Sequence, residues 1–477
     1  MKHIFLLTAM LSSIACTIGC AVKQTSAPQA PAEETLVTAP AITEPPVTWV
    51  VPETFNPNVD GLGLEQLQGT ELSYIYDPLV CHADPSEGGD GHYESVMHGT
   101  YNHHQQFAIL GDYVVVFWTN HVRDENGPGQ RLMARVGKFS ADGSAIDWGD
   151  PNDIIEMAPP AQNAGRRPTS DDGDTITGIF LDGNLTLTNG RIFVRGRLML
   201  CDGWTNSMLY HHSPNTAPVP DEHYNKTKTK DYRFDIYWYI TSFIQEWKLV
   251  DGRLEPASDV YLNGPAIPEG LQVTPSIYKK MGTVNEPYAS AKPVTEAPED
   301  FKKGMTGEIK EVTRRPKYAP GTDKIAADGV NGLAHWTEFI RPDGKYVVVR
   351  DNLLAPETYY ASIKDNAEQC YPPAVKTNLF GVAMPVSGEL PDGTVWFVGS
   401  DMKRENAYIT WSKDGILFDK TKLLLFMRFE GTPGLHAPKA QGAQYFQTMT
   451  RGNYIWLVFS VAKQKIGLLR IPFDSLK

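Results

Sequence analysis

Polar residues able to transfer protons gather around one strongly apolar segment of this chain. Residues 101–131 read Y-N-H-H-Q-Q-F-A-I-L-G-D-Y-V-V-V-F-W-T-N-H-V-R-D-E-N-G-P-G-Q-R and predict a β-hairpin whose apolar strand, Tyr113 to Trp118, lies in a core. The polar residues that this hairpin would bring to one place are His103, His104, Gln105, Asn120, His121 and Arg131. Three imidazoles together favour a site of acid–base chemistry, whereas any one of them alone is equally well an exposed loop residue.

Two further predicted strands carry groups that could bind or activate a substrate. In R-I-F-V-R-G-R-L-M-L, Arg195 and Arg197 are two residues apart and share one face of the strand. A core cannot bury two unpaired guanidinium groups, so they face a polar channel, carboxylates or a ligand. In D-I-Y-W-Y-I, Tyr237 and Tyr239 also share a face. Salt bridges for the arginines and aromatic packing for the tyrosines are the alternatives.

A metal site is a third candidate. Cys201, His211 and His212 lie close together in the sequence, and His223 and Cys370 could join them. Thiolate and imidazole ligands suit a structural zinc, and calcium is the other candidate, although the spacing matches no zinc motif. A buried thiol and surface histidines are the alternative. The chemistry considered below requires no cofactor.

The first 50 residues are predicted to lie outside the folded domain. Residues 1–20 have the charged start and short apolar stretch of a signal peptide, and the stretch is too short to span a membrane. Cys16 in S-I-A-C and Cys20 in T-I-G-C each resemble a lipobox but lack its leucine. We expect an exported protein, either an outer-membrane lipoprotein or a periplasmic or secreted one. Residues 21–50 are rich in Pro, Ala, Thr, Ser and Glu and predict a disordered tether.

The charge argues against a protein that binds nucleic acid, and the cysteine content excludes a disulfide scaffold. The net charge of −12 gives no global basic field for nucleic acid, so an anionic ligand would need a local basic patch. Beyond the leader, Cys81, Cys201 and Cys370 allow at most one disulfide. We expect a monomer that contacts a membrane only through an N-terminal lipid.

The rest of the chain predicts an all-β fold. Short apolar strands recur between Gly-Asp, Asp-Gly, Asn-Gly and Gly-Asn turns, and helical periodicity is nearly absent. The clearest strands are Tyr113–Trp118, Arg191–Leu200, Phe234–Phe243, Tyr346–Arg350, Val395–Val398 and Tyr454–Phe459. At roughly 60 residues per four-stranded blade, residues 51–477 would form a single seven-bladed β-propeller. Residues 278–324, rich in Lys, Pro, Glu and Thr, interrupt the rhythm as an insertion.

One motif resembles a known family of propellers. W-S-K-D-G-I-L-F at 411–418 resembles the Asp-box of BNR-repeat, sialidase-like propellers, with Ser412, Asp414, Gly415 and Phe418 in the motif positions. The segments L-P-D-G-T-V-W-F-V-G-S and G-N-Y-I-W-L-V-F-S-V-A-K-Q-K-I-G-L-L-R-I-P are similar to the last blades of such proteins, and residues 335–351 are similar to another. The Asp-box is structural and implies a fold, not an activity.

Within that superfamily, N-H-H-Q, W-T-N-H and G-P-G-Q-R most resemble the propeller-type ulvan lyases, similar to polysaccharide lyase family 25. The resemblance implies β-elimination on a uronate-containing sulfated glycan. The catalytic residues that it implies are His104, His121, Tyr237 and Arg197. The substrate-binding residues that we expect are His103, Gln105, Asn120, Arg131, Arg195 and Tyr239.

The residue types suit that elimination. An arginine would neutralise the uronate carboxylate through two parallel hydrogen bonds, and histidine or tyrosine would remove the C5 proton and protonate the leaving oxygen. Two alternatives stay open. One is a propeller glycoside hydrolase acting on rhamnose–glucuronate or sialic acid linkages, although the Arg-Ile-Pro motif of sialidases is missing near the start of the fold. The other is a non-catalytic glycan-binding lipoprotein.

Overall fold

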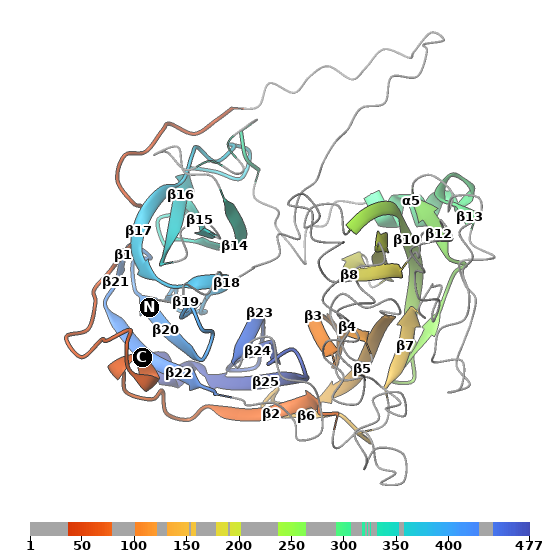
Figure 1. Cartoon of the computed structure of the whole chain (residues 1–477), viewed down its shortest axis with the longest axis horizontal. Coiled ribbons are helices and arrows are strands. Elements are labelled where there is room, and N and C mark those ends of the chain that lie inside the picture. The colour runs from red at the N-terminus through yellow and green to blue at the C-terminus, as the bar shows by residue number, and fades with distance from the viewer. Residues whose placement is uncertain are drawn as a thin grey trace, which may run out of the picture. The chain divides into compact units, whose positions relative to one another are not determined.

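The computed structural model describes residues 37–78, 101–121, 131–151, 154–158, 178–188, 191–201, 237–263, 292–306, 317–319, 322, 325, 332–352, 357–428 and 442–477. Most of these residues lie in antiparallel sheets (Figure 1). The chain divides into two compact units. Unit 1 comprises residues 1–67 and 315–426, and unit 2 comprises residues 68–314 and 427–477.

Unit 1 contains two four-stranded sheets, each made of strands that follow one another in the chain. The first sheet consists of β14 (Leu333–Ile340), β15 (Tyr346–Asn352), β16 (Thr358–Lys364) and β17 (Val375–Phe380). The second consists of β18 (Val382–Glu389), β19 (Val395–Ser400), β20 (Asn406–Ser412) and β22 (Lys420–Phe426). A short pair, β1 (Thr48–Trp49) and β21 (Leu417–Phe418), and the 3-10 helix η1 (Asp60–Gly63) complete the unit.

Unit 2 contains three sheets. One combines the N-terminal strand β2 (Glu71–Tyr76) with β23 (Ala443–Arg451), β24 (Tyr454–Val461) and β25 (Lys465–Pro472), followed by η5 (Phe473–Leu476). The next consists of β3 (Tyr101–Leu110), β4 (Tyr113–His121), β5 (Arg131–Phe139), β6 (Ile146–Asp147) and β7 (Ile155–Ala158). The last consists of β8 (Gly178–Thr188), β9 (Arg191–Cys201), β10 (Tyr237–Val250), β11 (Arg253–Pro256), β12 (Tyr261–Asn263) and β13 (Lys292–Pro293).

These antiparallel sheets of successive strands are propeller blades, so the all-β propeller prediction is confirmed. Five of the six strands singled out in the sequence form over their full predicted length, and the described part of the sixth, residues 237–243, lies in β10. The described residues hold five sheets of four or more strands, and the count of seven stays a prediction. No helix among the described residues is long and apolar enough to cross a membrane.

Each unit has a core in which neighbouring sheets pack face to face. In unit 1, Val349 and Tyr359 of one sheet meet Phe397 and Tyr408 of the other, and Trp49 stacks on Tyr408 with ring centroids 5.4 Å apart. In unit 2, alternate residues of β4, among them Val114, Val116 and Trp118, pack against β24 and β25. Burying one such side chain contributes about 1.5–3 kcal/mol. The core therefore fixes the strands that carry the polar groups described below.

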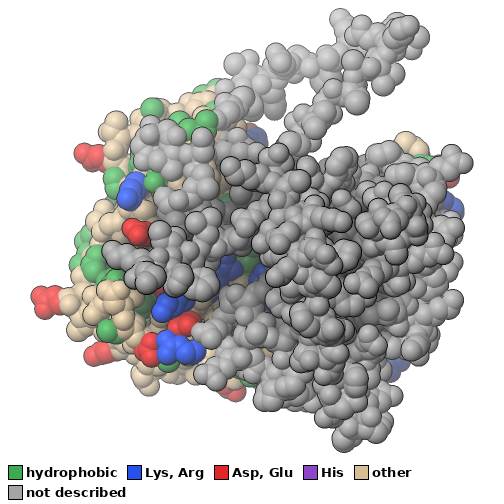
Figure 2. Space-filling view, in the orientation of Figure 1, with side chains coloured by type: hydrophobic (Ala, Val, Ile, Leu, Met, Phe, Trp, Pro, Cys, Tyr) green, Lys and Arg blue, Asp and Glu red, His purple; other side chains and the backbone are tan. Residues whose placement is uncertain are grey.

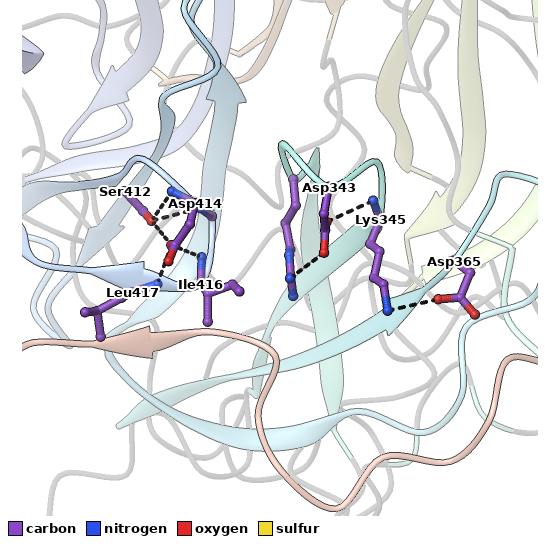
Figure 3. Close-up of polar contacts among 9 residues, drawn as sticks. Asp343, Lys345, Asp365, Ser412, Asp414, Ile416 and Leu417 are labelled. Atoms are coloured by element: carbon purple, nitrogen blue, oxygen red, sulfur yellow. Dashed lines mark hydrogen bonds and ion pairs between the residues drawn. The ribbon is translucent and has the colours of Figure 1, made fainter.

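The Asp-box predicted at residues 411–418 closes a hairpin as expected (Figure 3). The Asp414 carboxylate accepts a hydrogen bond from the Ser412 hydroxyl at 2.7 Å. The same oxygen accepts the backbone N–H groups of Ile416 at 2.7 Å and Leu417 at 2.9 Å. Phe418 is completely buried in the unit 1 core. The carboxylate thus sets the turn, and the aromatic ring attaches it to the blade.

A similar turn that the sequence analysis missed follows β5. The hydroxyl of Ser140 donates to Asp142 at 2.7 Å, and the backbone N–H of Ser144 donates to the same carboxylate at 3.0 Å. Hydrogen bonds from Ser144 and Ser140 lower the pKa of Asp142 to about 2. Asp343, which also accepts a backbone N–H, belongs to one of two Pro-Asp-Gly hairpins in unit 1 (Figure 3). Aspartate is therefore a recurrent turn residue of this fold.

Four sheets share a second feature at the opposite end from these turns. In each of them one edge strand changes its register with the following strand near its beginning; these edge strands are β3, β14, β18 and β23. In three of these bulges a non-glycine residue has a positive φ: His104 at 55°, Ala383 at 71° and Tyr445 at 59°. We call the end of a sheet at which such a bulge lies the bulge end of that sheet. Bulges redirect side chains and are frequent beside active sites.

The described surface carries charges of both signs. Figure 2 shows acidic and basic side chains lying close together on the face it displays. Exposed ion pairs such as Lys413–Asp392 at 2.8 Å and Lys345–Asp365 at 3.2 Å are of this kind. Such pairs contribute only about 0–1 kcal/mol each, so they do not determine the fold.

Two expected boundaries differ from the structure. The tether predicted for residues 21–50 ends earlier, because Val47 and Trp49 are buried and Thr38 pairs with Cys370. The predicted insertion is also partly folded. Its residues 292–306 form β13, η4 (Val294–Glu296) and α5 (Glu299–Thr306). Ala297 and Phe301, four residues apart, pack together against a sheet, a short apolar pattern that the sequence analysis missed. The predicted leader lies outside the described residues.

The Asp-box predicts a measurable contribution to stability. We expect Asp414→Ala to lower the free energy of unfolding by about 1–3 kcal/mol, because three hydrogen bonds to a charged acceptor are lost. Denaturant unfolding measures the change. Asp419→Ala is the matched control, since it removes an exposed carboxylate from the same hairpin. Equal losses for the two variants would contradict a specific role of Asp414.

Candidate functional site

The bulge ends of β3 and β23 bring three rings together in unit 2. The ring of Tyr445 lies edge-on to His103, with centroids 4.2 Å apart, and to His104, at 5.5 Å. The two imidazoles are 4.4 Å apart. Both His104 and Tyr445 have positive φ, a conformation that costs a non-glycine residue about 1–2 kcal/mol. Backbone strain of this kind clusters at functional sites.

His103 is the most deeply buried of the three rings. It is completely buried, and its Nδ1 is 2.7 Å from the hydroxyl of Ser460 on β24. A serine hydroxyl can donate or accept, so this contact is compatible with either tautomer of the imidazole. His103 therefore supports the ring of Tyr445 from inside the protein. His104, one residue along, is half-buried.

Gln105 connects the two bulges. Its side-chain amide donates to the backbone carbonyl of Gln444 at 3.2 Å and to that of Tyr445. Gln105 is only 1% exposed, so it holds the strained turn of β23 instead of reaching solvent. A side chain that was expected to bind substrate thus positions Tyr445.

Asn102 holds a second strained segment in place. Its side-chain oxygen accepts the indole N–H of Trp118 at 2.8 Å and an amide N–H of Asn120 at 2.7 Å. Its own amide donates to the carbonyl of Gln464 at 2.8 Å, and its backbone N–H donates to the carbonyl of Lys463 at 2.7 Å. These contacts fix the turn between β24 and β25, in which Ala462 and Lys463 have positive φ.

The structure describes the predicted site residues to different extents. His103 and His104 lie side by side on β3 with Gln105, and Asn120 on β4 pairs with Asn102; all of them except His104 are fully buried, and their roles at a site stay predictions. For His121 and Arg131 only the backbone is described: His121 pairs with Tyr101, and Arg131 pairs with Asn120. Both are therefore at the bulge end of this sheet.

The other predicted site residues lie on β9 and β10. Arg195 pairs with Ile244 and is half-buried, and Arg197 pairs with Ser242. Tyr237 pairs with Cys201, and Tyr239 pairs with Met199. The side chains of Arg197, Tyr237 and Tyr239 lie outside the described part of the structure. Their proposed roles stay predictions.

The predicted metal ligands are only partly described. Cys201 is the last residue of β9, whereas His211 and His212 lie outside the described residues. Cys370 is a free, buried cysteine in unit 1. Among the residues that the structure describes, no group of three or more His, Cys, Asp or Glu side chains is arranged to hold a metal ion.

Tyr445, Ser460 and Gln444 were missed as site residues. They lie in segments interpreted only as strands of the last blades. A signal was present, because A-Q-Y-F-Q begins its strand with polar and aromatic residues in the way that N-H-H-Q-Q-F does. Comparing the start of each predicted strand would have identified the second bulge.

Comparisons with known proteins support the fold. No protein-family model matches the chain, and no curated protein matches it. Among solved structures, one described as a sialidase superposes with a TM-score of 0.55 at 17% identity, over 89% of this chain. This chain spans only 35% of that sialidase. The likeness establishes a shared all-β propeller fold.

Two further structures are more distant. A protein of unknown function from Dyadobacter fermentans is 12% identical with a TM-score of 0.40, over 85% of this chain and 99% of that one. An α-L-arabinofuranosidase from Fusarium graminearum is 13% identical with a TM-score of 0.36, over 85% of this chain and 99% of that one.

The Asn102 network predicts a large effect on stability. We expect Asn102→Ala to lower the free energy of unfolding by about 2–4 kcal/mol, because Trp118 and Gln464 each lose a buried hydrogen-bond partner and each such loss costs about 1–3 kcal/mol. Denaturant midpoints measure this. Asn453→Ala, which removes the same amide from an exposed turn, is the control and should change stability by less than about 0.5 kcal/mol.

Proposed function

We propose that this protein is a glycan-cleaving enzyme whose chemistry takes place at the bulge ends of β3 and β23. The observation that carries this proposal is the contact of His103, His104 and Tyr445, three rings held by strained bulges and buried hydrogen bonds. Imidazole and phenol groups fit proton transfer in both directions. The sialidase-like fold supports a carbohydrate as the substrate.

The finer proposal is β-elimination on a uronate-containing, sulfated polysaccharide such as ulvan. His104 and Tyr445 are the described groups that could remove the C5 proton and protonate the leaving oxygen. His121 and Tyr237 remain candidates for the same roles. Arg131, whose backbone pairs with Asn120, and Arg197 are the candidates to neutralise the carboxylate. No cofactor is required for these steps.

A glycoside hydrolase is the second candidate, and the TM-score of 0.55 to a sialidase favours it. One assay separates the two reactions. Incubation with ulvan and other uronate polymers should give both reducing ends and the ultraviolet absorbance of an unsaturated uronate if the enzyme is a lyase. Reducing ends alone would indicate a hydrolase. Retention on the polymer without either product would indicate a glycan-binding protein.

The location proposed for the protein follows from its first residues. We propose export, with a lipid anchor on Cys16 or Cys20 in the outer membrane, or cleavage and release. An exported monomer with a carbohydrate site would meet polysaccharides outside the cytoplasm.

His104 allows activity and stability to be tested separately. Because His104 has a φ of 55°, His104→Gly relieves backbone strain while it removes the imidazole. We expect turnover to fall about 10²–10⁴-fold with an unchanged or higher melting temperature. Ala383→Gly is the matched control, since it relieves a φ of 71° at another bulge and should leave turnover intact. Normal turnover in His104→Gly would place the chemistry elsewhere.

Arg197→Lys tests how the carboxylate is neutralised. A lysine keeps the charge but cannot form two parallel hydrogen bonds, so binding and turnover should both fall. The loss should be larger for a uronate polymer than for its carboxyl-reduced form. If Arg197 forms a structural ion pair instead, the melting temperature should fall and turnover per folded molecule should be unchanged.

A further inference from the structure

The bulge of β14 in unit 1 also contains a histidine. The register of β14 shifts between Leu333 and Trp336, and His335 lies in that shift. Its backbone N–H donates to one carboxylate oxygen of Asp351 at 2.7 Å, and its Nδ1 is 2.9 Å from the other. Asp351 is completely buried, and the side chain of His335 is 13% exposed. Each oxygen of this buried carboxylate thus contacts the same histidine.

Asp351 restricts the imidazole of His335 more than Ser460 restricts the imidazole of His103 in unit 2. An ionised carboxylate only accepts hydrogen bonds, so Asp351 favours the tautomer with its proton on Nδ1. The lone pair then lies on Nε2, and the ring is held in one orientation. A carboxylate that holds a histidine in this way is the arrangement of acid–base centres in several enzyme classes.

Unit 1 buries several other polar groups. Asn352, Ser400, Asp401 and Asn406 are all less than 7% exposed. Burial raises the pKa of the Tyr359 phenol well above its ordinary range, and the charges of Asp351 and then Asp401 add to that shift. The hydroxyl itself donates to the backbone carbonyl of Val382 at 3.1 Å. Polar groups are rarely buried in such number without a structural network or a site.

From this geometry we propose that His335 is a second acid–base residue, positioned by Asp351, which exchanges a proton with a hydroxyl group of a carbohydrate bound to unit 1. The proposal rests on the proposed function for its ligand class. Asp351 is a positioning residue, since it acts through the imidazole. The proton moves between the ligand oxygen and Nε2, while the proton on Nδ1 stays hydrogen-bonded to Asp351.

Chemical footprinting tests the positioning. Diethyl pyrocarbonate acylates the unprotonated imidazole nitrogen, and mass spectrometry of peptides follows each histidine separately. We expect Asp351→Asn to slow acylation of His335 several-fold, because an amide N–H can donate to Nδ1 and leave the proton on Nε2. Asp343→Asn, a change at an exposed turn of the same sheet, should leave the rate unchanged. Equal rates in the two variants would overturn the positioning role.

Protection by ligands tests the site. Ulvan oligosaccharides, sialyllactose and arabino-oligosaccharides are the probes, and at least one should slow acylation of His335 in the unsubstituted protein. Failure of all three would overturn the proposal. This arm also decides the matter if the Asp351→Asn protein does not fold. Protection of His335 without cleavage would contradict only the proposed function, whereas cleavage with protection of His104 alone would contradict only this proposal.

Discussion

The break in strand register at the start of an edge strand, as in β3, β14 and β23, is the constraint on which the candidate sites depend. A regular strand would direct alternate side chains into the two faces of its sheet, where apolar packing leaves no room for unpaired polar groups. In β3 and β23 the bulge turns His104 and Tyr445 out of that alternation and brings their rings within 5.5 Å. The site thus results from a local departure from the sheet that also forms the core.

That departure has a cost, and the neighbouring residues offset it. A positive φ at His104, Tyr445, Ala462 or Lys463 costs about 1–2 kcal/mol in each case. Gln105 binds the backbone of one strained segment and Asn102 binds the other, through groups that are almost completely buried. Since these amides satisfy carbonyl groups that water cannot reach, the strain persists in the folded protein.

The sequence predicted the fold better than it predicted the site. Apolar strands between Asp-Gly turns and the Ser412–Asp414 motif depend on local chemistry, and the structure contains them. The partner of His103 could not be read in the same way, because Ser460 is 357 residues away in the chain. Phe301 shows the same limit on a smaller scale, since it packs a short helix against a sheet within a segment that was interpreted only as an insertion.

His103 and His335 differ in what their hydrogen-bond partners permit. Ser460 can donate to His103 or accept from it, so that imidazole can change tautomer without losing its hydrogen bond. Asp351 can only accept when ionised, and it also binds the backbone of His335, so that ring keeps one tautomer and one orientation. An imidazole held in one tautomer and one orientation, as in His335, suits a group that accepts a proton from one fixed direction. An imidazole that can change tautomer, buried against Tyr445, suits a supporting role in the proposed proton transfer by His104 and Tyr445.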